Sequence, residues 1–168
     1  MAMIVSSPEP RLGSRILSIA EVCDAVASLL NAATLSRPAT AVREYLPRFD
    51  LADLGDAIKL SVTPGETFTT TRISRQSWQR DVQVRVTAIS QLGGDPYEEQ
   101  IDGLMAFVEE VRAAIEASEL RDEDTWKGEG RQSLIAVSVE ADPILDLAGL
   151  EQMRQFASAL TVTYRVID

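Results

Sequence analysis

The sequence contains no histidine, only one cysteine (Cys23) and only two lysines (Lys59 and Lys127). Histidine is the commonest general base and the commonest metal ligand, so its absence excludes Ser-His-Asp and Cys-His catalysis and any zinc site that uses histidine. A single cysteine excludes an intrachain disulfide. Apolar runs also stay well below the roughly 20 residues of a membrane helix, and Met1–Val5 is too short for a signal peptide. We therefore expect synthesis in the cytosol and no membrane partner.

Composition is that of an ordinary globular chain with a strong excess of acid. Its 168 residues are 45% hydrophobic and 25% charged, which fits one domain with a proper core. The net charge is −10, whereas DNA-reading modules are normally basic, so we expect no sequence-specific DNA binding. Arginine far outnumbers lysine, which suits desolvated ion pairs at interfaces or follows from a GC-rich genome.

Residues able to carry chemistry are few, and each has a simpler interpretation. Asp50, Asp53 and Asp56 lack the alternate spacing and closing glutamate of a calcium loop, and the acidic run 122–124 is typical of a solvated loop. Cys23 lies on an apolar helical stripe, which indicates a buried structural thiol. Paired carboxylates of the glycosidase type have no cleft marked out for them. We expect no enzyme, no catalytic residues, no metal and no cofactor.

The expected organisation is a flexible arm over residues 1–14 followed by a single α+β domain over 15–168. Ser18 and Glu21 have capping-box spacing, which predicts that the first helix begins there. Asp95 as N-cap, Pro96 at the first helical position and Glu98 as the capping-box acid predict the second helix. The expected apolar stripes are Ile19, Val22, Cys23, Val26, Leu29 and Leu30 on the first helix, and Ile101, Leu104, Met105, Val108, Val111 and Ile115 on the second.

Period-two alternation predicts the strands, which form a mainly antiparallel sheet with two helices packed on one face. Lys59, Ser61 and Thr63 are expected on the exposed side of their strand, which Pro64-Gly65-Glu66 then breaks. Residues 119–131 are expected to form a mobile loop holding Trp126. The connectors are expected at 47–56 and 142–151, and the strands at 41–46, 58–63, 67–74, 78–89, 133–140 and 156–167.

Charge is divided unevenly between the Thr- and Arg-rich strands and the second helix. Residues 66–85 carry four arginines against two acids, a net of +2, and residues 97–124 carry ten acids against two arginines, a net of −8. A strand pair that is polar on both sides has no core of its own to hold it, so we expect a protruding β-ribbon that pairs with a neighbour, with an ordinary surface hairpin as the alternative. The candidate subunit-interface residues are Arg72, Arg75, Trp78 and Arg80 on the ribbon, and Glu98, Glu99, Asp102, Glu109 and Glu110 on the helix.

A family resemblance follows from the order of these elements. A short helix precedes a strand ending near Tyr45-Leu46-Pro47, then come the strand 58–62, the Arg/Thr-rich segment, the strand 80–86, the acidic helix and a strand close to residue 168. Over roughly residues 15–168 this layout resembles the tail terminator (tail completion, or head-tail joining) proteins of long-tailed bacteriophages and related gene transfer agents.

The resemblance implies a structural virion protein without catalytic residues. It implies a six-fold homo-oligomeric ring that caps the finished tail tube, stops its polymerisation and docks the connector of the head, with DNA passing through the ring. Its partners would be further copies of itself, the tail tube protein and a head-completion protein, and its location the neck of the virion, assembled in the host cytoplasm. The alternatives are another ring component of the phage neck or tail, or a non-viral α+β binding module.

Overall fold

A computed structural model describes residues 18–46, 57–94, 97–121 and 133–167. Within these ranges it contains three helices and six strands. Several expectations fall outside these ranges: the 1–14 arm, the connector 47–56, the Asp95 and Pro96 caps, the acidic run 122–124 and Trp126. In chain order the elements are α1 (Ile19–Ala32), β1 (Ala39–Arg43), β2 (Ile58–Arg72), β3 (Trp78–Gln91), α3 (Tyr97–Glu116), β4 (Glu119–Arg121), β5 (Ser133–Ala141), α4 (Leu147–Met153) and β6 (Gln155–Ile167).

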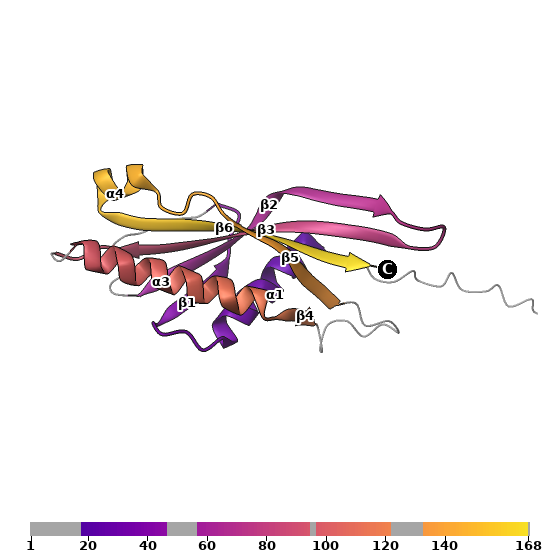
Figure 1. The fold of residues 1–168 in the computed structure, drawn as a ribbon, viewed down its shortest axis with the longest axis horizontal. Helices are drawn as coiled ribbons and strands as arrows, with labels where there is room; N and C mark the ends of the chain where they lie inside the picture. The colour runs from indigo at the N-terminus through magenta and orange to yellow at the C-terminus, as the bar shows by residue number, and fades with distance from the viewer. Residues whose placement is uncertain (1–17, 47–56, 95–96, 122–132, 168) are drawn as a thin grey trace, which may run out of the picture.

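The six strands form one sheet in the order β1-β2-β3-β6-β5-β4 (Figure 1). Only β1 and β2 run parallel, and every other neighbouring pair is antiparallel. The expected α+β class with a mainly antiparallel sheet is therefore confirmed. β3 lies between the hairpin partner β2 and the C-terminal strand β6, and it pairs with β6 from Gln79 to Gln91.

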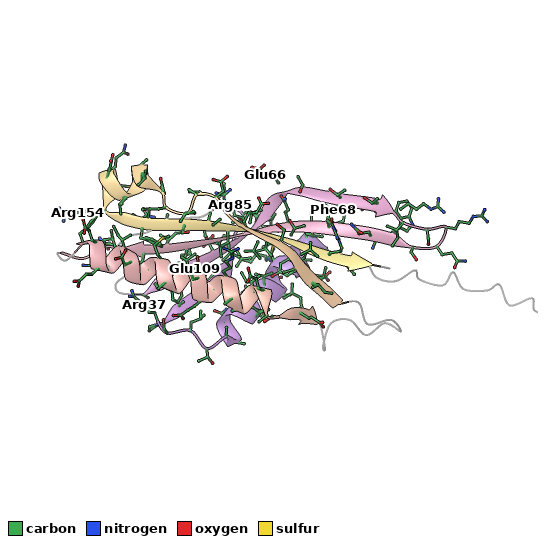
Figure 2. All side chains as sticks on the ribbon, in the orientation of Figure 1. Arg37, Glu66, Phe68, Arg85, Glu109 and Arg154 are labelled. Atoms are coloured by element: carbon green, nitrogen blue, oxygen red, sulfur yellow. The ribbon has the colours of Figure 1, made fainter. Side chains whose placement is uncertain are left out.

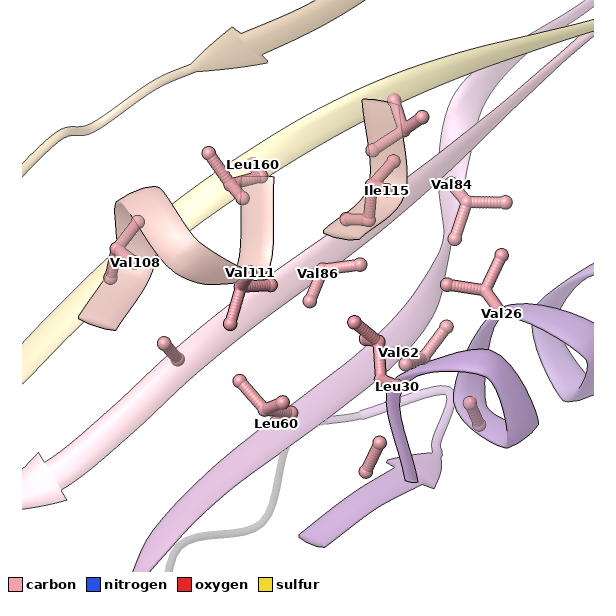
Figure 3. Packing of buried hydrophobic residues seen from close by; sticks show 14 of the residues in the cluster. Val26, Leu30, Leu60, Val62, Val84, Val86, Val108, Val111, Ile115 and Leu160 are labelled. Atoms are coloured by element: carbon pink, nitrogen blue, oxygen red, sulfur yellow. The ribbon is translucent and has the colours of Figure 1, made fainter. Parts of the chain in front are cut away.

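Helices α1 and α3 and the strands of the sheet contribute to one hydrophobic core cluster. Val26 and Leu30 of α1 and Val108, Val111 and Ile115 of α3 pack against alternate residues of β2, β3 and β6 (Figure 3). The strand residues shown there are Leu60, Val62, Val84, Val86 and Leu160. The expected stripes supplied most of the helical core, although Ile19 is exposed and the buried Phe107 of α3 was not among them.

Helix α1 begins as its capping residues predict. The Ser18 hydroxyl accepts a hydrogen bond from the Glu21 backbone N–H at 3.2 Å, and the Glu21 carboxylate accepts one from the Ser18 N–H at 2.9 Å. At the other end of the helix, the Asn31 amide donates to the Ala41 carbonyl at 2.9 Å and accepts from the Ala41 N–H at 2.8 Å. Asn31 thereby satisfies both backbone groups of Ala41 on the outer side of the edge strand β1.

The expected break at Pro64-Gly65-Glu66 is wrong, because β2 runs through these residues as one 15-residue strand. The ladder with β3 shifts register between Pro64 and Phe68, which is a β-bulge. Proline is tolerated here because β1 pairs with β2 only as far as Val62, so Pro64 needs no outward N–H. The segment bends the strand instead of ending it.

The predicted exposure of Ser61 and Thr63 is also wrong, since both are buried. The Ser61 hydroxyl donates to Glu44 at 3.0 Å, and Glu44 also pairs with Lys59. These contacts cover the polar side of β2. The alternation of residue types along the sequence did not reveal that β2 lies inside the sheet, between β1 and β3. The neighbouring strand β1 begins two residues before the expected start and ends three residues before the expected end.

Two expected loops contain regular structure. Residues 119–121 form β4, paired with β5, where a loop was expected. The expected connector 142–151 contains most of helix α4, which ends at Arg154 in the left-handed conformation (φ 49°). Glycine is the usual residue at such a position, so the sequence lacks the ordinary signal for the end of this helix.

Replacing Gly65 with alanine is expected to destabilise the fold by about 1–3 kcal/mol, the usual cost of overpacking. A Cβ at Gly65 would lie 2.5 Å from Cβ of Gln83 and 2.8 Å from its backbone carbonyl, so the bulge would have to move. Gly94→Ala is the matched control, because its Cβ would meet nothing within 4 Å. Urea unfolding of both variants measures the difference, and equal stabilities would contradict the close approach at the bulge.

Candidate subunit-contact surfaces

The outer part of the β2–β3 hairpin forms the first surface. We call residues 66–80 the hairpin end. Along β2 every residue from Glu66 to Arg72 is exposed. Phe68 pairs with Val82 and Arg72 pairs with Trp78. Directly paired residues share a side of the sheet, so Phe68, Arg72 and Trp78 all lie on the side that carries the core residue Val82.

Apolar and basic side chains are mixed on the hairpin end. Phe68, Ile73 and Trp78 are 39–50% exposed. Arg80 lies two residues from both Trp78 and Val82 on β3 and so shares their side of the sheet. With Arg72, Arg75 and Arg80 against Glu66 alone, the formal charge of the hairpin end is +2. The side of the sheet that forms the core therefore continues outward as an exposed surface that is both apolar and basic.

Local contacts hold the tip of the hairpin in one shape. The Arg72 guanidinium lies 5.5 Å from the centre of the Trp78 ring, a cation–π distance. The same guanidinium donates to the carbonyls of Ser74 and Arg75, at 3.1 and 2.8 Å. The Ser74 hydroxyl accepts from the Ser77 N–H at 3.0 Å. The structure thus brings two predicted interface residues, Arg72 and Trp78, into direct contact with each other.

The predicted acidic residues lie along helix α3. Glu98, Glu99, Asp102 and Glu109 are exposed. Glu110 is partly buried, and it accepts a hydrogen bond from the Ser36 N–H at 2.9 Å. Hydrogen bonding from Ser36 holds the pKa of Glu110 below its ordinary value, and the nearby Arg37 acts in the same direction. Glu110 therefore has a role inside the subunit, tying α3 to the loop before β1.

The basic and acidic surfaces lie apart within the chain. Figure 1 shows the turn between β2 and β3 at one end of the long axis, and the start of α3 beside α4 at the other. In Figure 2, Phe68 and Arg154 lie toward these opposite ends, with Glu109 between them. The arginines of the hairpin end and the first acids of α3 are thus not brought together inside a subunit.

An ion pair on the opposite side of the sheet ties the hairpin to the C-terminal strand. Asp81 and Arg165 are direct partners between β3 and β6, and two hydrogen bonds of 2.8 Å join the guanidinium to the carboxylate. Hydrogen bonding from Arg165 holds the pKa of Asp81 below its ordinary value of 3.8, against the opposing effect of its partial burial. The pair fixes β3 where it enters the hairpin end.

Sequence reasoning missed Phe68 and Ile73. They are the only large apolar residues in the polar stretch from Thr67 to Ser77, and that isolation was the available signal. It also missed the apolar residues around α4, because Pro143 and Gly149 are typical of a connector and so gave no indication of a helix.

The buried position expected of Cys23 is confirmed. Its side chain is buried, and burial raises the pKa of the thiol to about 11, far from that of a nucleophilic cysteine. Over the described ranges, no cluster of three or more Cys, Asp or Glu side chains has the arrangement of a metal site. None of the described helices has both the length and the apolar character needed to cross a membrane.

Comparison with known proteins identifies no family, so the geometry described above is the main basis for inferring a function. No family model matches the sequence, and no curated protein matches it significantly.

Asp81→Asn is expected to lower the free energy of unfolding by a nearly constant amount above about pH 5, where Asp81 of the parent protein is charged in both states. A lowered folded-state pKa stabilises the fold above the unfolded pKa, and this contribution is lost as the pH falls. The difference between parent and variant should therefore shrink below about pH 4. Urea unfolding between pH 3 and 7 measures it, with the exposed Glu140→Gln as control. A difference that does not change with pH would contradict the ion pair.

Proposed function

We propose that this chain is a structural ring subunit, a tail terminator at the head-proximal end of a long-tailed bacteriophage tail tube. In this role it stops polymerisation of the tube and joins the tail to the connector of the head. The observation that carries the proposal is the separation, on one subunit, of an exposed apolar and basic hairpin end from an acidic helix. The resemblance in element order supplies the particular role.

The hairpin end acts as a protruding ribbon in this proposal. β1 covers the outer edge of β2 only along Ile58–Val62, and the following residues from Glu66 are exposed. β6 supports the other side of this hairpin by pairing with β3 as far out as Gln79, so the outer edge of β2 beyond Val62 is the part that we propose a neighbouring subunit covers. Helices α1 and α3 share one core cluster with alternate strand residues, which supports the packing of both helices on one face and leaves the ribbon for assembly.

A ring of identical subunits requires heterologous contacts, in which two different surfaces meet around a closed rotation. The hairpin end carries +2, and α3 carries Glu98, Glu99, Asp102 and Glu109 exposed. Opposite charges of this kind set the register of a contact and speed its formation. The remaining negative charge, from a net of −10, would repel DNA passing through the ring, so that DNA does not bind to it.

Arg75→Glu is expected to raise the concentration needed for assembly by about fivefold or more, the effect of losing an exposed ion pair and adding a repulsion. Arg75 is exposed at the tip, so the subunit itself should remain folded. The defect should be larger at low salt, where screening is weaker.

Sedimentation velocity at two salt concentrations measures this change. Arg75→Lys, which keeps the charge, is the matched control and should assemble normally. Mixing the Arg75→Glu chain with a Glu98→Arg, Glu99→Arg chain should restore part of the assembly. Unchanged oligomer size for Arg75→Glu would reject the charged contact.

The role at the tail requires a direct test. Purified protein added to polymerising tail tubes should cap one end of each tube and limit its growth, visible by electron microscopy. A protein that assembles normally but never sits at a tube end would reject the tail-terminator role while leaving self-association intact.

A further inference from the structure

Helix α4 turns apolar side chains toward solvent. Ile144, Leu147 and Met153 are each more than half exposed, although they lie within a ten-residue stretch. We call residues 142–154 with the adjacent first turns of α3, residues 97–102, the α4 surface. Three large apolar side chains exposed so close together in sequence are candidates for an interaction site.

The orientation of α4 is fixed, so these side chains have no way to turn inward. Leu150 is buried, and its carbonyl accepts a hydrogen bond from the Tyr97 hydroxyl at 3.4 Å. The Arg154 carbonyl accepts from the Leu92 N–H at 3.0 Å, which ties the end of the helix to the end of β3.

The α4 surface is also strongly acidic. Residues 142–154 and 97–102 carry six acids, Glu98, Glu99, Asp102, Asp142, Asp146 and Glu151, against Arg154, a net of −5, and the Arg85 guanidinium reaches the same surface at the Asp142 carbonyl. The hairpin end carries three large exposed apolar residues and a charge of +2. The two surfaces therefore carry opposite net charges, and both expose large apolar side chains.

We infer that the α4 surface is the docking site for the hairpin end of a second copy of this chain. The two surfaces lie at opposite ends of the long axis (Figure 1), so a subunit does not satisfy them internally. Trp78, held in place by Arg72, is the anchor: a rigid aromatic side chain loses little entropy on binding, and aromatic residues dominate interface energies. The inference rests on the proposed self-association and specifies its contact, placing the apolar part on α4 and not on α3 alone.

The first test is photo-crosslinking of the full chain with benzoylphenylalanine at position 147. Position 137 on β5, where Val137 is also exposed and apolar, is the matched control. Cross-linked dimers from position 147 should yield, by mass spectrometry, a peptide containing residues 68–78 of the second copy. Position 137 should not yield that peptide.

The outcomes separate this inference from the proposed function. Cross-links from position 147 to another region of the second copy, in an oligomer of normal size, would overturn the inference and leave the ring proposal standing. A chain that sediments as a monomer at every concentration would overturn both.

The second test is a double-mutant cycle on assembly. Leu147→Glu and Trp78→Ala are each expected to weaken self-association about tenfold or more, as loss of a central apolar contact does. Both residues are exposed, so the subunits should still fold, and Val137→Glu is the control. If the residues meet, the double variant should be scarcely weaker than either single variant, because the second change removes a contact already lost. Multiplied effects would overturn the direct contact.

Discussion

The position of β3 between two strands, with an unbroken ladder to β6, is the constraint on which the rest of the structure depends. Because β2 and β6 hold it along its length, its side chains alternate between two faces without interruption. Val82, Val84 and Val86 belong to the same core cluster as the buried residues of α1 and α3. The same alternation then presents Trp78 on the same face, farther along the strand, where it is exposed. The core and the contact surface are thus two parts of one sheet face, and the bulge beside Gly65 lies where one gives way to the other.

The rigidity of both the hairpin end and the α4 surface favours the proposed contact. Arg72 is already committed to Trp78 and to two carbonyls of the turn, so less side-chain freedom is lost when the hairpin end docks. At the other end, α4 is tied to β3 and α3 by backbone carbonyls. Opposite charge around both apolar patches selects one orientation and disfavours like surfaces meeting. Contacts between unlike surfaces close into rings or extend into filaments, which is why this geometry fits a structural role.

Local signals predicted much of this fold. The capping box at Ser18 and the alternation from Val82 to Ala88 placed α1 and β3 correctly, because both depend on neighbours in sequence. Failures came where distant contacts decide: Pro64 is accepted in β2 only because β1 has ended, and Ser61 is buried only because Glu44 and Lys59 meet over it. Helix α4 was not predicted, because Arg154 ends it in a left-handed conformation that usually requires glycine. The charges at the candidate surfaces could be predicted from the sequence. The contact between α4 and the start of α3 could be seen only in the three-dimensional structure.

The most direct measurement for this account is a cryo-electron microscopy reconstruction of the purified full chain at assembly concentrations. The account predicts a closed ring in which the hairpin end of every subunit rests on the α4 surface of its neighbour, with the same contact repeated around the axis. A monomer, or a two-fold dimer in which identical surfaces face each other, would contradict it.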